Sequence, residues 1–177
     1  QRRVVRYAED LESKLIEVIC DSLQTMQPAQ LYTGTGSAKF AINRRQYNLD
    51  GISIGHNPIG PVDHDVPVLK VVGEEDNLLA VVFGYACHNT TLSFYKLCGD
   101  YAGFAQEYLE KVHPDTVAMF FSGCGGDANP NPRRELSHAE MHGLELAGAV
   151  NEVLSAPMKQ VEGTIRHAYT EIDLPLT

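Results

Sequence analysis

The stretch Phe120–Arg134, Phe-Phe-Ser-Gly-Cys-Gly-Gly-Asp-Ala-Asn-Pro-Asn-Pro-Arg-Arg, passes from an apolar strand pattern directly into a loop. Val117–Phe121 is short, apolar and rich in strand-forming residues, which predicts a β-strand. Gly123, Gly125 and Gly126 permit backbone conformations and close approaches that other residues resist, and the prolines that follow prevent an early helix. Because functional residues often lie where a rigid strand meets such a loop, we expect this stretch to form the floor of an active site.

Helix and strand patterns alternate along the rest of the chain. Apolar residues recur every three or four positions over Val4–Leu23, which predicts an amphipathic helix that ends before Pro28. A strand pair or bulged strand is predicted over Leu31–Ile42, with a glycine break at Gly34 and Gly36, and a surface loop follows over Gln46–Pro61. Two further strands are predicted over Asp65–Val72 and Leu78–Ala86, and a terminal strand over Gln160–Leu174. Two helices are predicted over Tyr101–Val112 and His138–Leu154, with Asp100 and Ser137 as their capping residues.

This order of elements predicts the α/β class, with a mixed β-sheet covered by α-helices. With 177 residues and 44% hydrophobic content, the chain is long enough to bury a core of its own. No internal repeat, low-complexity tract or linker interrupts the pattern. We therefore expect a single domain over residues 1–177.

Charge and cysteine content exclude several classes of function. The formal net charge is −9 and the basic residues are scattered, which argues against a nucleic-acid partner. No apolar run approaches the roughly 18 residues that a membrane-spanning helix requires, so no transmembrane segment is expected. The four cysteines are irregularly spaced and form no Cys-x-x-Cys pair, so we expect reduced, mostly buried thiols, with disulfides between them as the alternative that an even count allows.

His88 is the histidine best placed for chemistry. It follows the apolar strand Leu78–Ala86 and precedes a threonine-rich polar segment, where an imidazole can ligate a metal or carry a proton. The alternative is a structural histidine with a satisfied hydrogen bond. His138 and His142 are four residues apart on a predicted helix, but their surroundings do not match a zinc-protease pattern.

The glycine run offers backbone amides to an anion. No Gly-Lys-Ser or Gly-Lys-Thr follows it, so a nucleotide-phosphate loop is not indicated. The amides of Gly125 and Gly126 could instead form an oxyanion hole or a substrate clamp. Ser122 and Cys124 are possible nucleophiles, although the sequence assigns neither of them a base.

Polar side chains with oxygen or guanidinium groups complete the set of candidates. Asp127, Asn129 and Asn131 can hydrogen-bond a substrate or ligate a metal, or they can simply tighten the loop through Asx turns. Arg44 and Arg45 follow a predicted strand and could bind a carboxylate or an oxyanion. Solvated surface arginines are the alternative interpretation.

Four segments, in the same order along the chain, resemble the neutral ceramidase family. They are His88-Asn-Thr-Thr followed by Gly99-Asp-Tyr-Ala-Gly-Phe-Ala, the loop Phe120–Asn131, the pair Asn43-Arg44, and Val62-Asp63-His64-Asp65 before a Leu-Lys strand. That family comprises zinc-dependent amidases, secreted or on the cell surface, which hydrolyse the N-acyl bond of ceramide. The resemblance implies that this chain is the middle of a larger α/β catalytic domain.

The resemblance also implies roles for individual residues. It makes zinc the expected cofactor, a lipid or N-acyl small molecule the expected substrate, and an extracellular or periplasmic compartment the expected location. The expected zinc ligand is His88, with the remaining ligands outside this segment. The expected catalytic residues are Arg44, Asp127 and Asn129, and the expected substrate-binding residues are Gly125, Gly126 and Asn131.

One departure from the family pattern bears on catalysis. The related loops carry a serine before Pro-Asn, and this chain has Asn129 there, followed by Pro130 and Asn131. A carboxamide cannot replace a hydroxyl nucleophile, whereas a mechanism based on zinc hydroxide would survive the change. The alternative to an amidase is therefore a non-catalytic member of the fold that acts as a binding module.

Overall fold

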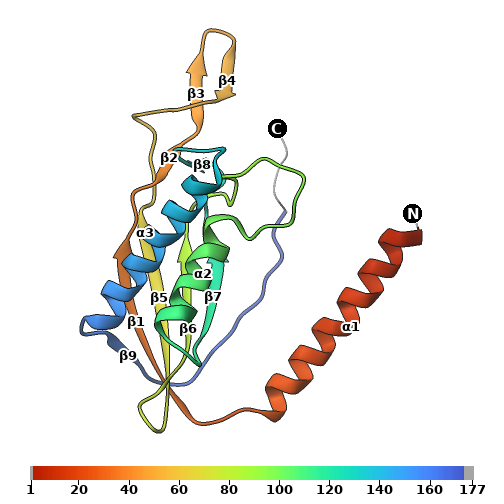
Figure 1. Ribbon diagram of the computed structural model, residues 1–177, viewed down its shortest axis with the longest axis vertical. Coiled ribbons are helices and arrows are strands. Elements are labelled where there is room, and N and C mark those ends of the chain that lie inside the picture. The colour runs from red at the N-terminus through yellow and green to blue at the C-terminus, as the bar shows by residue number, and fades with distance from the viewer. Residues whose placement is uncertain (1, 174–177) are drawn as a thin grey trace.

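The computed structural model describes residues 2–173 (Figure 1). Its central feature is a five-stranded sheet in the order β7-β6-β5-β1-β9. In chain order, the elements are α1 (Arg2–Gln24), β1 (Ala29–Ser37), β2 (Ala41–Asn43), β3 (Arg45–Asn48), β4 (Gly51–Ile54), β5 (Asp65–Gly73), β6 (Leu78–Tyr85), α2 (Asp100–Val112), β7 (Val117–Ser122), β8 (Ala128–Pro130), α3 (Leu136–Ser155) and β9 (Lys159–Val161).

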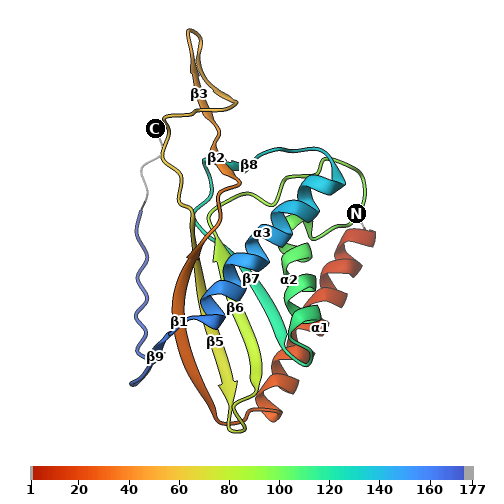
Figure 2. The ribbon, with the colours of Figure 1, turned by 60° about the vertical axis from the view of Figure 1, so that its left-hand side comes forward.

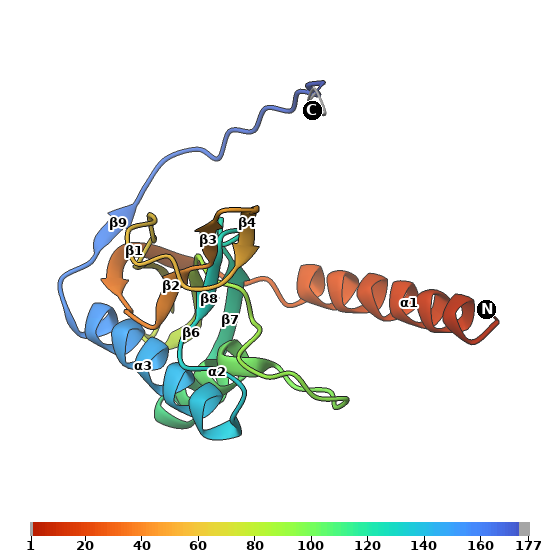
Figure 3. The same ribbon diagram turned by 90° about the horizontal axis from the view of Figure 1, so that it is seen from above.

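The sheet is mixed, and two helices cover one of its faces. Strands β6 and β7 are parallel, with α2 as the crossover between them, and the other neighbouring pairs are antiparallel. Helices α2 and α3 pack on each other and lie on the same side of the sheet (Figures 2 and 3). The predicted α/β class, with a mixed sheet and covering helices, is confirmed.

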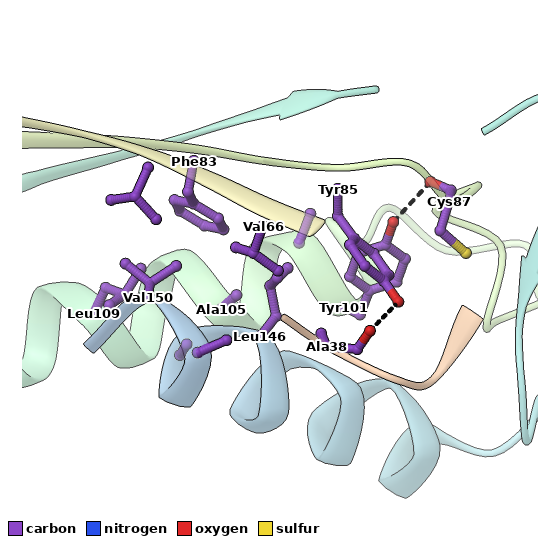
Figure 4. Close-up of a cluster of buried hydrophobic side chains, with 14 of the residues drawn as sticks. Ala38, Val66, Phe83, Tyr85, Cys87, Tyr101, Ala105, Leu109, Leu146 and Val150 are labelled. Carbon is purple, nitrogen blue, oxygen red and sulfur yellow. Dashed lines mark hydrogen bonds between the residues drawn. The ribbon is translucent and has the colours of Figure 1, made fainter. Parts of the chain in front are cut away.

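The core lies between the sheet and these two helices (Figure 4). Alternate residues of a strand point to the same face, so Val81, Phe83 and Tyr85 of β6 all face the helices and are fully buried. Helix residues Leu109 and Leu146 meet them from the other side. The buried end of the core near Tyr85 leads directly into the segment that carries the candidate site.

Strand β1 runs through its two glycines without a break. A Cβ atom on Gly36 would lie 2.9 Å from the carbonyl oxygen of Ala149 in α3, and one on Gly34 would lie 2.6 Å from the Val153 side chain. The glycines therefore let α3 approach the sheet closely. The predicted region forms two strands, β1 and β2, with the interruption at residues 38–40, where Ala38 and Phe40 are buried. The two strands do not pair with each other, because β1 pairs with β5 and β9 whereas β2 pairs with β8.

Several predicted boundaries were wrong. The expected loop Gln46–Pro61 contains the hairpin β3–β4, whose polar and glycine-rich composition concealed a short, fully exposed strand pair. Helix α3 begins at Leu136, and its N-cap residue is Glu135 rather than Ser137. Helix α2 includes Asp100, so Gly99 takes the cap position.

The C-terminal segment forms less strand than predicted. Only Lys159–Val161 pairs with β1, and the remaining described residues up to 173 have no strand structure, while Leu174 lies outside the described residues. The β-forming residues of this segment, such as Ile165 and Tyr169, are exposed, so propensity alone does not hold them in a sheet.

Helix α1 matches its prediction in extent but does not pack into the core formed by the other described elements. None of its residues is buried, and its apolar side chains, such as Val4, Leu15 and Ile19, are exposed. It extends away from the sheet and the other helices (Figure 3). Between residues 2 and 173, no helix combines the length and apolarity needed to cross a membrane.

Candidate active site

The short strand pair β2–β8 brings two distant parts of the sequence together. Asn43 lies opposite Ala128, and Ile42 lies opposite Asn129. The sequence predicted an irregular loop at β8, because glycine and proline surround it. Tertiary pairing with β2 imposes a three-residue strand there, and it places the Asn43-Arg44 pair beside the glycine-rich loop.

The same loop packs against the end of β6. A Cβ atom on Gly125 would lie 2.5 Å from the backbone nitrogen of Cys87, so this position requires glycine for close approach. The backbone N–H of His88 donates to the carbonyl oxygen of Ala128 at 3.2 Å, and that of Gly123 donates to Tyr85 O at 3.0 Å. His88 therefore lies beside the loop, as the predicted site requires.

Arg44 is held by the loop and is not a solvated surface arginine. Its backbone N–H donates to Asp127 O at 2.7 Å, its Nη1 to Asn129 Oδ1 at 3.3 Å, and its Nη2 to Gly126 O at 3.0 Å. Arg45 Nη2 donates to the same Gly126 oxygen at 3.2 Å. The Nε atom of Arg44 is buried and has no hydrogen-bond partner among the described residues. It is thus one donor that a ligand could satisfy.

The Asn43 side chain hydrogen-bonds three residues around the site, and the sequence did not single it out as a site residue. Its side chain is 3% exposed, and its Nδ2 donates to Pro61 O at 2.9 Å and to Asp127 Oδ2 at 3.0 Å. Its Oδ1 accepts from the backbone N–H of Arg45 at 3.0 Å. The available signal was the position of an asparagine at a strand end next to two arginines, where a buried amide can orient its neighbours.

The imidazole of His88 has an unsatisfied nitrogen. Its Nε2 is buried without a hydrogen-bond partner in residues 2–173, as are the hydroxyl oxygens of Thr90 and Thr91 nearby in the chain. The predicted alternative for His88, a histidine with satisfied hydrogen bonds, does not describe this nitrogen. A buried, unpaired imidazole nitrogen suits a metal ligand.

The described residues do not assemble a complete metal site. Within residues 2–173, no group of three or more His, Cys, Asp or Glu side chains lies close enough together to hold a metal ion. A catalytic zinc is normally held by three protein ligands. His88 therefore fits the role of one ligand, and the described part of the chain does not provide the others.

His138 and His142 both hydrogen-bond backbone carbonyl groups of the chain that leaves β8. His138 Nδ1 lies 3.0 Å from Arg133 O, and His142 Nε2 lies 2.8 Å from Pro132 O. The His142 ring also stacks on Phe40 with the ring centroids 4.5 Å apart. Burial lowers the pKa of His142, which favours the neutral ring in this position.

The cysteines are free thiols, but they are not mostly buried as predicted. Only Cys87 is buried, whereas Cys20, Cys98 and Cys124 are exposed. Burial raises the pKa of Cys87 to about 12, so at neutral pH it is a protonated thiol and a poor nucleophile. Ser122 and Cys124 are both exposed at the start of the glycine-rich loop, and His88 Nε2 is hydrogen-bonded to neither.

The remaining predicted substrate-binding groups lie around the same loop. The Gly125 N–H donates to Gly123 O at 2.8 Å, and the exposed Gly126 directs its carbonyl oxygen to the two arginines. The backbone N–H of Asn131 donates to Phe40 O at 2.8 Å while its side chain is exposed. Substrate contacts by this loop remain a prediction.

Comparisons with known proteins give a structural likeness only. No family model and no curated protein matches the sequence. The fold resembles that of ceramidases. One solved structure, a ceramidase complexed with C2, is 20% identical with a TM-score of 0.66, and a neutral ceramidase from Pseudomonas aeruginosa is 19% identical with a TM-score of 0.63. Each alignment covers 78% of this chain and 24% of the other, so the chain spans about a quarter of the length of these ceramidases.

Proposed function

We propose that this chain is part of a zinc-dependent amidohydrolase that cleaves the N-acyl amide bond of ceramide or a related N-acyl lipid. The observation that carries the proposal is the convergence of Arg44, Asn129 and the Gly126 loop with His88 at one end of the sheet. Two buried polar atoms there, Arg44 Nε and His88 Nε2, lack partners among the described residues. The ceramidase-like fold supports the same class of reaction.

In this proposal each residue has a separate task. His88 Nε2 would hold zinc, which when bound polarises a carbonyl group and lowers the pKa of water. Arg44 would place its free Nε–H near the carbonyl oxygen, where negative charge develops as the amide is attacked. Asn129 and Gly126 fix the guanidinium by accepting from Nη1 and Nη2, so the donor is already oriented before substrate binds.

The remaining zinc ligands would come from other parts of the full-length protein. The expected substrate is amphiphilic, with an apolar acyl chain and an amide, and the expected location is extracellular or periplasmic. Both expectations follow from the ceramidase resemblance. Fractionation of the native host, with the protein detected by antibody, would test the location directly.

Activity of the full-length protein tests the proposal. We expect a panel of N-acyl substrates, assayed with added zinc, to reveal amide hydrolysis that His88→Gln reduces by at least about a hundredfold through the loss of a ligand. Arg44→Lys should lower kcat by about ten- to a thousandfold, because the bidentate hold and the free Nε–H are both lost. Arg45→Lys is the matched control and should cost less than about threefold, since only one exposed bond is removed.

Asn129 favours a second candidate, a ceramidase-like binding module without catalysis. Asn129 is 5% exposed and accepts from Arg44, so its place in the site is occupied by a carboxamide without a nucleophilic hydroxyl. No turnover of any amide by the wild type, together with saturable binding of an N-acyl lipid, would favour this candidate. Gain of hydrolysis in Asn129→Ser would show that the serine is the missing catalytic group.

A further inference from the structure

Asp100 is a buried carboxylate whose hydrogen bonds lead to the segment of His88. It is 6% exposed and stands at the start of α2. Its Oδ1 accepts from the backbone N–H groups of Tyr101 at 2.8 Å and Thr91 at 3.2 Å, and its Oδ2 accepts from that of Leu92 at 2.9 Å. Two of these three donors belong to the chain that leaves β6, so the carboxylate ties this chain to the helix.

The backbone at Asp100 adopts a conformation that needs a reason. Its φ is +53°, in the left-handed region that L-residues other than Asn and Asp seldom occupy. Such outliers persist where surrounding contacts hold them, often near functional sites. The next residue, Tyr101, is fully buried and donates its hydroxyl to Cys87 O at 2.7 Å, immediately before His88. The start of α2 therefore hydrogen-bonds the His88 segment through two residues, Asp100 and Tyr101.

The segment is also fixed from its other side. Arg133 Nε donates to Thr90 O at 2.8 Å, and the backbone N–H of Arg134 donates to Thr91 O at 2.7 Å. Residues 88–92 thus lie between the start of α2 and the chain that leaves β8, with bonds to both. A short segment held this way keeps one backbone conformation, which orients the side chains that it carries.

We propose that Asp100 is a positioning residue, which sets the orientation of the His88 imidazole by anchoring the backbone of residues 91 and 92. The role as part of a zinc site rests on the proposed function, whereas the anchoring itself does not. Asparagine has the same shape and tolerates the same φ, so Asp100→Asn removes acceptor capacity at one oxygen without changing the backbone preference. In the variant, the side-chain amide NH₂ group must face a backbone N–H group, and two donors cannot hydrogen-bond each other.

Hydrogen–deuterium exchange measured by mass spectrometry on the full-length protein tests the anchoring. We expect Asp100→Asn to speed amide exchange in peptides covering residues 89–92 by about ten- to a hundredfold, because a buried N–H loses its acceptor. Exchange in β6 should stay within about twofold of wild type. The matched control is Glu110→Gln, since Glu110 on the same helix accepts from Ala118 N–H at 3.2 Å, away from His88. It should leave residues 89–92 unchanged.

A second variant covers the case in which Asp100→Asn does not fold. Arg133→Ala removes the bond to Thr90 O from the half-exposed side of the segment, and its side chain is outside the core. It should also speed exchange over residues 89–92. If Asp100→Asn folds, unchanged amide exchange over residues 89–92 in that variant would overturn the proposal. If it does not fold, unchanged exchange in Arg133→Ala would show that the segment keeps its conformation without one of its anchors, which would overturn the proposal as well.

Hydrogen–deuterium exchange at the imidazole carbon between the two ring nitrogens reports on the His88 side chain itself and does not require zinc. We expect its rate to change at least about twofold in Asp100→Asn, whereas His113, bonded to Asn151 at 2.7 Å, should match wild type. The positioning role would be overturned if Asp100→Asn speeds amide exchange but leaves the His88 ring exchange rate and the retention of zinc against a chelator at their wild-type values. Unchanged zinc retention in His88→Gln would reject the zinc site, and the two exchange rates alone would then decide the role of Asp100.

Discussion

At the scale of single residues, the site depends on buried and partly buried polar side chains that hydrogen-bond one another. Asn43 uses both ends of its carboxamide, and Asp127 depends on it for a donor. Removing a shared partner costs more than one hydrogen bond, because several groups lose their partner at once. The residues around Arg44 should therefore respond as a unit to substitution.

Asn43→Ala is expected to lower the free energy of unfolding by about 1–3 kcal/mol, since the partly buried Asp127 carboxylate, the Pro61 carbonyl and the Arg45 N–H each lose a partner. Urea denaturation followed by circular dichroism measures the change. Asn48→Ala is the control, because the Asn48 side chain bonds the exposed Ser53 side chain in the β3–β4 hairpin and its loss should cost less than about 0.5 kcal/mol. Equal losses in both variants would contradict the role assigned to Asn43.

Stability should fall in alkaline solution because of Cys87. Burial raises its pKa from the usual 9.0 to about 12, so well below pH 9 the thiol is protonated in both the folded and the unfolded state. Above pH 9 the unfolded chain releases this proton and the folded chain keeps it, so the free energy of unfolding decreases as pH rises from about 9 toward 12. Unfolding measured between about pH 8.5 and 9.8 should show a shallower decrease in Cys87→Ala. The same decrease in both proteins would rule out this thiol as the cause.

At the scale of elements, the packing of α2 on α3 depends on a glycine. A Cβ atom on Gly143 of α3 would lie 2.5 Å from the Phe104 side chain and 2.9 Å from the carbonyl oxygen of Tyr101. The second atom is backbone and cannot rotate away. Because Tyr101 also contacts Cys87, the spacing of these helices reaches the His88 segment.

Two substitutions in the same helix should have opposite effects. Gly143→Ala is expected to destabilise the fold by about 1–3 kcal/mol, since the added methyl group overpacks the helix contact. Gly148→Ala should stabilise it by about 0.5–1 kcal/mol, because a Cβ atom there meets nothing within 4 Å and alanine favours the helix. Thermal or urea unfolding of the two variants measures both changes, and stabilisation by both would refute the close contact.

At the scale of the whole molecule, apolar surface remains uncovered on the face of the sheet opposite α2 and α3. Val117, Met119 and Phe121 of β7 are exposed, while Ala118 and Phe120 alternate with them toward the core. Helix α1 adds a second exposed apolar surface. Strands that are apolar on both faces usually lie between two covering layers.

This surface should make the 177-residue chain associate with itself. We expect sedimentation velocity to show concentration-dependent oligomers, because a large exposed apolar area is stabilised by burial between copies. Met119→Glu with Phe121→Glu should shift the population toward monomer. The control double variant Glu74→Gln with Glu75→Gln changes exposed residues in the β5–β6 turn and should leave the distribution unchanged. A monomer at all concentrations would contradict this expectation.

The fold could be predicted further than the site. Alternating and helical apolar periods identified α1, β5, β6, α2 and β7, because burial of one face imposes those periods. The hairpin β3–β4 was missed since its residues are all exposed and leave no burial pattern. The cap residues were misplaced because Asp100 and Ser137 satisfy cap composition, while the helix starts are set by contacts elsewhere.

Local composition and spacing were enough to predict the α/β class, the strand-to-loop transitions at His88 and Gly123–Gly126, and Arg44 as a candidate. The pairing of β2 with β8, the bond from Asn43 to Asp127, and the bonds from the Asp100 carboxylate to the backbone after His88 arise from the folded arrangement alone. Those contacts join residues as far apart in the sequence as Ala41 and Pro130. Their partners are chosen by packing and hydrogen-bond satisfaction in the folded core, which no local pattern encodes.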